Sequence, residues 1–187
     1  MMFRLGVALC ICISFFSCDP CNRLDCVHGT CENRSCQCDE GYLGTECSVQ
    51  AKPERITIVG MHFENLPDEV FGDVKWDDDT TTNKSYLPDV IMQLRFGTSQ
   101  DVVFTSVERY MNAEAFEFVF DDAMNIHVSG AFPELRLTLA DLDLPAPTKM
   151  YVMEVAGYYS PVRGFPTSFR YEDKSGASVV LDLVYTH

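Results

Sequence analysis

The sequence has no cysteine after Cys47, a single tryptophan at Trp76, and half as many basic as acidic residues, 14 against 28. The long cysteine-free part cannot be held by disulfides and must fold around an apolar core. Because no cluster of Lys and Arg is present to displace counterions from phosphate, we expect no nucleic-acid partner. The formal charge of −14 also disfavours simple electrostatic attachment to anionic lipid.

Motifs that carry catalysis are also missing. The sequence contains no Gly-x-Ser-x-Gly elbow, no phosphate-cradling glycine loop and no paired-histidine metal motif. His62 and Glu64 would share one face of a strand, but a catalytic zinc site needs a third protein ligand. We therefore expect the chain not to be an enzyme.

The N-terminus carries an apolar run from Leu5 to Phe16, which follows Arg4. It is too short to span a bilayer, so residues 1–17 are interpreted as a secretory signal peptide. The pair Ser17-Cys18 resembles the lipobox of bacterial lipoproteins, which implies that Cys18 is acylated and begins the mature chain. Phe15 stands where that pattern usually has leucine. Plain secretion is the alternative, and it leaves Cys18 as a free thiol or in an intermolecular bridge.

Six cysteines lie between Cys21 and Cys47. An even set in a stretch too short for its own core predicts a module held by disulfides. Such modules form in oxidising compartments, so we expect the chain to be exported. Spacing alone leaves many connectivities open.

The segments Cys26–Cys31 (CVHGTC) and Cys36–Cys47 (CQCDEGYLGTEC) resemble an epidermal-growth-factor-like (EGF-like) domain. In that family the first cysteine pairs with the third, the second with the fourth and the fifth with the sixth. The resemblance therefore implies the disulfides Cys21–Cys31, Cys26–Cys36 and Cys38–Cys47. Only Asp19 precedes the first cysteine, where calcium-binding members carry several acids. We interpret residues 18–50 as a spacer or contact unit near the membrane.

From Arg55 onward, apolar residues alternate with polar ones at period two. This pattern predicts roughly seven to nine short strands separated by turn residues, and hence an antiparallel β-sandwich over residues 51–187. Aromatic side chains in the pattern are expected in the core. The clearest alternating sets are Ile56 and Ile58; Val90, Met92, Leu94 and Phe96; Phe116, Phe118 and Phe120; Leu135, Leu137 and Leu139; and Val179, Leu181, Leu183 and Tyr185.

Three segments bear on the kind of sandwich: Leu87–Leu94, Asn112–Phe118 and Leu135–Asp143. They place an Asp at a strand entrance, a polar turn before an aromatic strand, and two acids one residue apart after a strand. Together they resemble the C-two domain, the calcium-dependent phospholipid-binding sandwich of protein kinase C and synaptotagmin, over residues 54–157.

The C-two resemblance implies a calcium site. Its ligands would be Asp89, Asp141 and Asp143, with help from Asp77 and Asp79. Calcium takes roughly six to eight oxygens. The family has a second acid in the first loop, and this chain has Asn83 at the corresponding distance instead. Residues 145–149, in the third loop, contain no acid. We therefore expect weak calcium binding. The alternative interpretation is that these acids are solvated turn residues.

Three functions are compatible with this organisation. The first is a surface-anchored binding or adhesion protein with a protein or glycan ligand and a lipid anchor in the membrane. The second is a domain that associates with membranes in the presence of calcium. The third is a carbohydrate-binding sandwich in which Trp76, Tyr158 and Tyr159 stack on sugar.

Overall fold

The computed structural model describes residues 21–67, 88–111, 113, 117–121, 124–142 and 147–187. Every regular element in these ranges is a β-strand, so the prediction of a mainly β chain with a small disulfide-rich module is confirmed. No helix in these ranges is long and apolar enough to cross a membrane. The signal peptide and the residues Cys18, Trp76, Asp77, Asp79, Phe116 and Asp143 lie outside the described part.

The chain divides into two compact units between Val49 and Gln50. In the first, β1 (Gly29–Glu32) and β2 (Ser35–Cys38) form an antiparallel pair, and the short β3 (Tyr42–Leu43) pairs with β4 (Val49–Gln50). Its disulfides join Cys21 to Cys31, Cys26 to Cys36 and Cys38 to Cys47, the pairs that the EGF-like resemblance implies. Disulfides of this density are typical of oxidising compartments, and the chain is an exported protein.

Backbone geometry and disulfides, rather than packing, shape this module. Within residues 21–49, Cys47 is the one fully buried residue. Gly29 is required by a close approach, because a Cβ there would lie 2.2 Å from the carbonyl oxygen of Gln37. The ring of His28 stacks on that of Tyr42 with centroids 3.9 Å apart.

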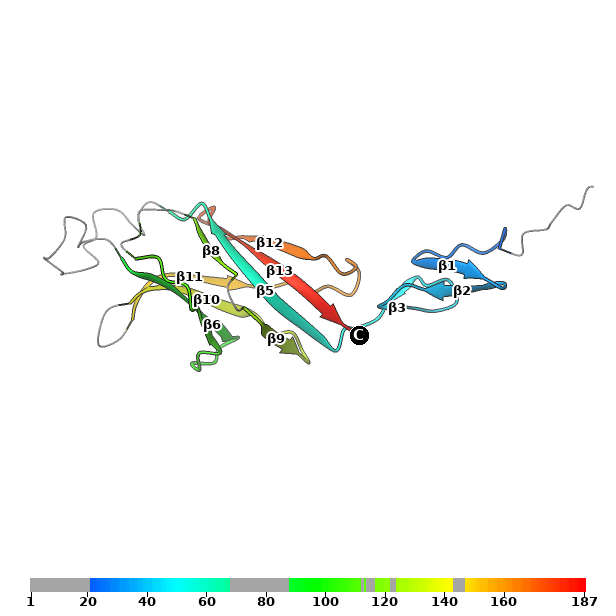
Figure 1. The fold of residues 1–187 in the computed structure, drawn as a ribbon, viewed down its shortest axis with the longest axis horizontal. Coiled ribbons are helices and arrows are strands. Elements are labelled where there is room, and N and C mark those ends of the chain that lie inside the picture. Colours follow the sequence, from blue (N-terminus) through cyan, green and yellow to red (C-terminus); the bar gives the residue numbers. More distant parts are fainter. Residues whose placement is uncertain (1–20, 68–87, 112, 114–116, 122–123, 143–146) are drawn as a thin grey trace, which may run out of the picture. The chain divides into compact units, whose positions relative to one another are not determined.

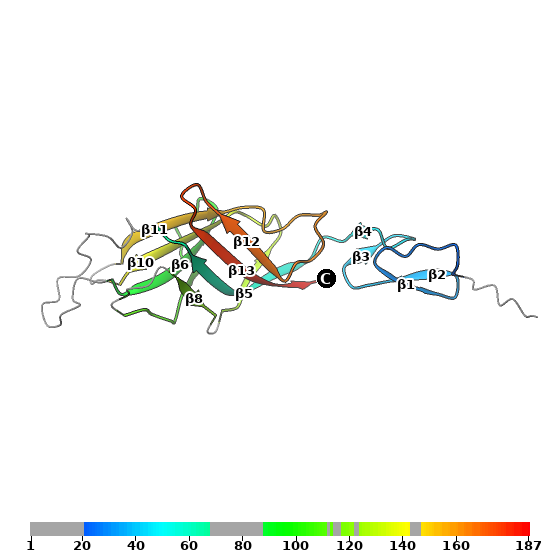
Figure 2. The ribbon, with the colours of Figure 1, turned by 90° about the horizontal axis from the view of Figure 1, so that it is seen from above.

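The second unit is an antiparallel sandwich of two sheets, shown in Figure 1 and from above in Figure 2. Its strands lie within residues 55–186. One sheet has the order β11 (Thr148–Val155), β10 (Leu135–Asp141), β6 (Val90–Phe96) and β7 (Phe104–Thr105). The other has the order β12 (Ser168–Glu172), β13 (Ser178–Thr186), β5 (Arg55–Glu64) and β8 (Phe118–Phe120), with β9 (Ile126–Ser129) also paired to β5.

The core of the sandwich consists of the inward residues of both sheets, as the period-two pattern predicts. Phe118 and Phe120 are fully buried, and each packs edge-on against Tyr110, with centroids 4.9 and 5.6 Å away. The aromatic ladder is thus part of the core. Other fully buried residues include Ile56, Ile58, Met61, Phe63, Met92, Leu94, Leu135, Leu137, Leu139 and Met153.

Two irregularities change which side chains face the core. In β5 the register with β13 shifts between Asp182 and Leu183. The next core-facing residue after Ile58 is therefore Met61, three positions later instead of two. In β11 the register with β10 shifts between Leu139 and Ala140, which leaves Met150 as an extra residue. Such bulges reorient the side chains that flank them.

Several strand ends meet at one end of the sandwich, which we call the Asp141 end. Asp141, the last residue of β10, pairs with Val90 at the start of β6 and with Thr148 at the start of β11. In the other sheet, Ser178 at the start of β13 pairs with Glu64 at the end of β5. Residues distant in the sequence therefore come together here.

Candidate functional site

Two of the predicted calcium ligands meet at the Asp141 end. The backbone N–H of Asp89 donates a hydrogen bond of 2.8 Å to Oδ1 of Asp141, and the N–H of Leu142 donates one of 2.9 Å to the carbonyl oxygen of Asp89. Asp141 is buried, with 1% of its surface exposed, whereas Asp89 is half-buried. One carboxylate oxygen of Asp141 therefore binds the backbone at the entrance of β6.

The described residues do not by themselves make a calcium site. Calcium requires roughly six to eight oxygens, and two carboxylates do not supply them. Among the described residues, no group of three His, Cys, Asp or Glu side chains is placed to hold a metal ion. The other implied ligands, Asp77, Asp79 and Asp143, lie outside the described ranges.

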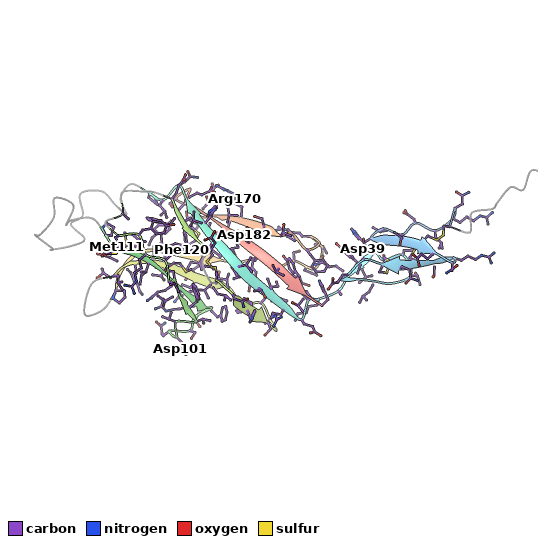
Figure 3. The ribbon with its side chains drawn as sticks, in the orientation of Figure 1. Asp39, Asp101, Met111, Phe120, Arg170 and Asp182 are labelled. Atoms are coloured by element: carbon purple, nitrogen blue, oxygen red, sulfur yellow. A yellow bond between two sulfur atoms is a disulfide. The ribbon has the colours of Figure 1, made fainter. Side chains whose placement is uncertain are left out.

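Exposed apolar side chains lie beside this acidic pair. Tyr110 forms an antiparallel bridge with Val90, with N–O distances of 2.9 and 3.0 Å. This bridge places Met111, which is 63% exposed, next to the entrance of β6 (Figure 3). Val107 precedes it on the same connection and is 71% exposed. The Asp141 end thus presents both acidic and apolar groups.

A polar cluster joins the two sheets near the same end. The hydroxyl of Tyr151 in β11 donates to the carboxylate of Asp173, which follows β12, and lies 2.8 Å from Oγ of Ser175. Burial and the neighbouring Asp173 carboxylate raise the pKa of Tyr151. Burial alone would raise the pKa of Asp173, but hydrogen bonds from Tyr151, Ser175 and Ala177 outweigh it and lower that pKa. The cluster holds β11 against the β12–β13 turn.

The aromatic residues that could stack on sugar are not arranged as a binding platform. Tyr158 is 2% exposed, and its hydroxyl donates a hydrogen bond of 2.8 Å to the carbonyl oxygen of Pro133. Its burial raises the pKa of that hydroxyl. Tyr159 is half-buried, with its ring 4.7 Å from that of Phe132. The interpretation of Tyr158 as a sugar-stacking residue is therefore wrong, because this ring belongs to the core.

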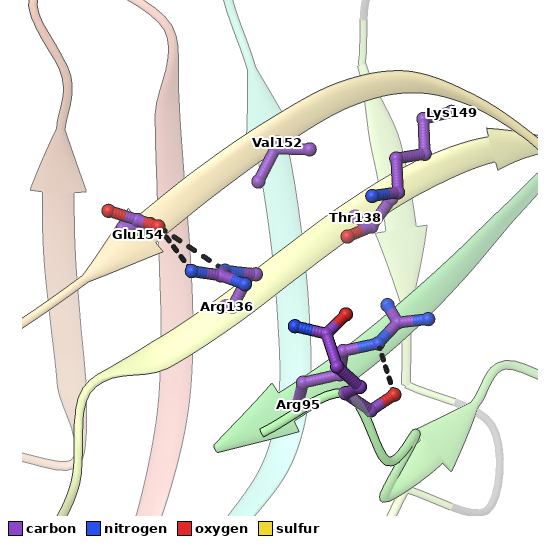
Figure 4. Close-up of a pocket in the computed structure, with 7 residues that line it drawn as sticks. Arg95, Arg136, Thr138, Lys149, Val152 and Glu154 are labelled. Carbon is purple, nitrogen blue, oxygen red and sulfur yellow. Dashed lines mark hydrogen bonds and ion pairs between the residues drawn. The ribbon is translucent and has the colours of Figure 1, made fainter. Parts of the chain in front are cut away.

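A polar pocket of about 190 Å³ opens on the outer face of the sheet formed by β6, β10 and β11 (Figure 4). Three of its side chains are basic, although the chain as a whole is strongly acidic. Each basic residue comes from a different strand, so the sequence shows no cluster. The lining residues are Arg95, Gln100, Arg136, Thr138, Lys149, Val152 and Glu154.

The three basic side chains differ in their partners. Nε and Nη2 of Arg136 both donate to Oε1 of Glu154, at 3.2 and 2.9 Å. Arg95 donates to the carbonyl oxygen of Gln100 at 3.2 Å and to the side chain of Gln93 at 3.0 Å. Lys149 is exposed and makes no hydrogen bond or ion pair with a described residue. It is the basic group of the pocket that retains its full capacity to bind an anion.

Thr138 lines the same pocket and is 1% exposed. Its Oγ1 atom is buried and has no hydrogen-bond partner. Its strand neighbours are Gln93 on β6 and Val152 on β11, so the hydroxyl lies between the side chains of those strands. Buried hydroxyl groups without a partner are uncommon in folded proteins.

The bulge at Met150 places Lys149 in the pocket. Met153 and Val155 of β11 are buried in the core, and strict alternation would put Lys149 on their face. Because Met150 is the extra residue, Lys149 instead pairs with Ala140 and shares the outer face with Val152. Sequence alternation could not reveal this basic group as part of a site, because a bulge has no clear signal in this stretch.

Comparisons with known proteins add no relative. No protein-family model matches the chain, and no curated protein sequence matches it. Its function must therefore be inferred from three structural features: the disulfide module, the Asp141 end and the outer-face pocket.

Proposed function

We propose that the chain is a non-enzymatic, exported binding or adhesion protein, anchored at a membrane surface by a lipid on Cys18. In this proposal an EGF-like module (residues 18–50) follows the anchor as a spacer. A C-two-like sandwich (residues 51–187) then makes contact with a protein or glycan ligand.

The outer-face pocket is the observation that carries this proposal. It concentrates Arg95, Arg136 and Lys149 on one face of a chain with a formal charge of −14. Its lining contains no histidine, cysteine or serine, and its one carboxylate, Glu154, is bound to Arg136. A site rich in donors and poor in bases or nucleophiles favours binding over catalysis.

Two further features support the finer parts of the proposal. The disulfide pairs of the module are those expected for an EGF-like domain. In the sandwich, Asp89 and Asp141 lie together at one end, as the C-two resemblance requires.

The test compares cells that produce the intact chain, cells that lack it, and cells with the variant Cys18→Ala. Loss of the chain is expected to reduce attachment to a protein- or polysaccharide-coated surface. Cys18→Ala should release the chain from the membrane fraction, and mass spectrometry of the intact protein should detect an acylated Cys18. Unchanged attachment with loss of an enzymatic reaction would contradict the proposal.

Calcium-dependent membrane association is the second candidate, and the exposed side chains of Val107 and Met111 favour it. They lie beside Asp89 and Asp141, where bound calcium would offset the local negative charge. Sedimentation with phosphatidylserine vesicles should then require calcium and fall for Met111→Ser. The control is Val162→Ser, which removes an 86% exposed side chain elsewhere. Equal sedimentation with calcium and with chelator would contradict this function.

A further inference from the structure

The unpartnered hydroxyl of Thr138 is the starting observation. Thr138 is almost completely buried, yet its Oγ1 has no hydrogen-bond partner. A buried hydroxyl without a partner is unfavourable, because it has lost its contacts with water and gained none from the protein. The residue lines the outer-face pocket, so a polar group that no described residue satisfies lies directly beneath the surface of this pocket.

The pocket offers mainly hydrogen-bond donors and positive charge. Lys149 has no partner among the described residues, and Arg95 binds only neutral oxygens, those of Gln100 and Gln93. Arg136 is already neutralised by Glu154. Two positive charges therefore remain uncompensated inside the pocket. Guanidinium and ammonium groups bind carboxylate, sulfate and phosphate oxygens strongly.

We propose that this pocket binds a single sugar ring that carries one anionic group: a carboxylate, a sulfate or a phosphate. Lys149 and Arg95 bind the anionic group, and Gln100 hydrogen-bonds to ring hydroxyls. This inference rests on the proposed function and names the ligand of its binding sandwich.

Size and charge favour a sugar over an extended anionic surface. The cavity volume of about 190 Å³ is below the roughly 300 Å³ of pockets that enclose drug-sized ligands, so the space suits one ring with one charged group. A membrane rich in anionic lipid would be repelled by the formal charge of −14. An isolated anionic sugar meets the pocket without bringing a large negative surface against the rest of the chain.

Calorimetric titration of the full chain with intact disulfides tests the ligand class. The probes are glucuronate, glucose 6-sulfate and glucose 6-phosphate, with glucose and inorganic sulfate as controls. At least one charged sugar is expected to bind about tenfold or more tightly than both controls. Equal affinity for inorganic sulfate would overturn the proposal, because the sugar ring would then contribute nothing. Binding only to vesicles with anionic lipid would also overturn it.

Matched charge variants test the location. Lys149→Gln and Lys174→Gln remove the same charge, but Lys174 is exposed in the β12–β13 turn and does not line the pocket. Lys149→Gln should weaken sugar binding about tenfold or more, whereas Lys174→Gln should leave it nearly unchanged. Glu154→Gln should strengthen binding, since it frees Arg136. Equal effects of the two lysine variants would overturn the assignment.

Failure of this inference is distinguishable from failure of the proposed function. If no sugar binds but loss of the chain still abolishes attachment, the pocket assignment falls and the adhesion proposal stands. If attachment persists without the chain, the adhesion proposal itself falls.

Discussion

The two units of this chain solve the problem of stability in opposite ways. The module at residues 21–49 has three disulfides and one fully buried residue, Cys47. The sandwich has no cysteine and a continuous core of aliphatic and aromatic side chains. A short segment gains stability by restricting its unfolded state, whereas a longer one gains it by burying apolar surface. The stability of the module therefore depends on redox conditions, whereas the stability of the sandwich depends on the packing of its core.

The sharpest way to separate the units is chemical reduction. Each disulfide closes a loop of 9 or 10 residues, and each such loop contributes roughly 2.5–3 kcal/mol in the chain-entropy view. Reduction with dithiothreitol should unfold the module completely. Amide NMR spectra should lose their dispersion for residues 21–49 and keep it for residues 55–186. Loss of dispersion in the sandwich would show that the two units are not independent.

The reciprocal change is made in the core. Phe118→Ala removes a ring that is fully buried against Tyr110, and such truncations cost about 3–5 kcal/mol. Urea denaturation followed by sandwich signals should show this loss, while the disulfide-bonded module keeps its NMR spectrum. Val162→Ala, at a site that is 86% exposed, serves as the control with little effect. A similar loss in both variants would contradict the core assignment.

A smaller effect is expected at the cluster that joins the sheets. Asp173→Asn should lower the free energy of unfolding by about 1 kcal/mol at neutral pH. Hydrogen bonds hold the pKa of Asp173 below its usual 3.8. Its contribution is therefore complete above pH 3.8 and is lost as the pH falls through the lower folded-state pKa. The difference between wild type and variant should shrink over that range in denaturation at stepped pH, and a difference that is constant with pH would contradict this role of Asp173.

The smallest expected effect has the opposite sign. Thr138→Val keeps the shape of the side chain and removes a buried hydroxyl without a partner, so the free energy of unfolding should rise by about 1 kcal/mol. Thr57→Val is the matched control, because the hydroxyl of Thr57 lies 3.0 Å from Nδ1 of His127, and its loss should be destabilising by about 1 kcal/mol. If Thr138→Val were destabilising as well as Thr57→Val, the hydroxyl of Thr138 would have a hydrogen-bond partner in solution.

The same contrast decides how much could be predicted from the sequence. Cysteine spacing identifies the module directly, because a disulfide framework is encoded by one residue type. Alternation identifies the strands of the sandwich, and it holds for Phe118 and Phe120 because one face of each strand is buried. It fails in β5 and β11, where the bulges at Val59 and Met150, the residues skipped in the pairing, change the face of the residues beyond them.

The candidate sites were predictable only in part. Asp89 and Asp141 were found because each acid stands at a strand end, and the structure brings them together. Arg95, Arg136 and Lys149 are too far apart in the sequence to form a visible basic cluster. Only sheet pairing and one bulge unite them. Sequence composition describes the average charge of a chain, whereas binding depends on the local charge of one face.

The most direct test is to titrate the oxidised and the reduced chain with the charged sugar that binds best. We propose that the sandwich recognises the ligand and that the disulfide module has an accessory role. We therefore predict the same affinity in both states, within about twofold, while NMR is expected to show the module unfolded in the reduced state. Loss of sugar binding on reduction, with the sandwich still folded, would contradict it.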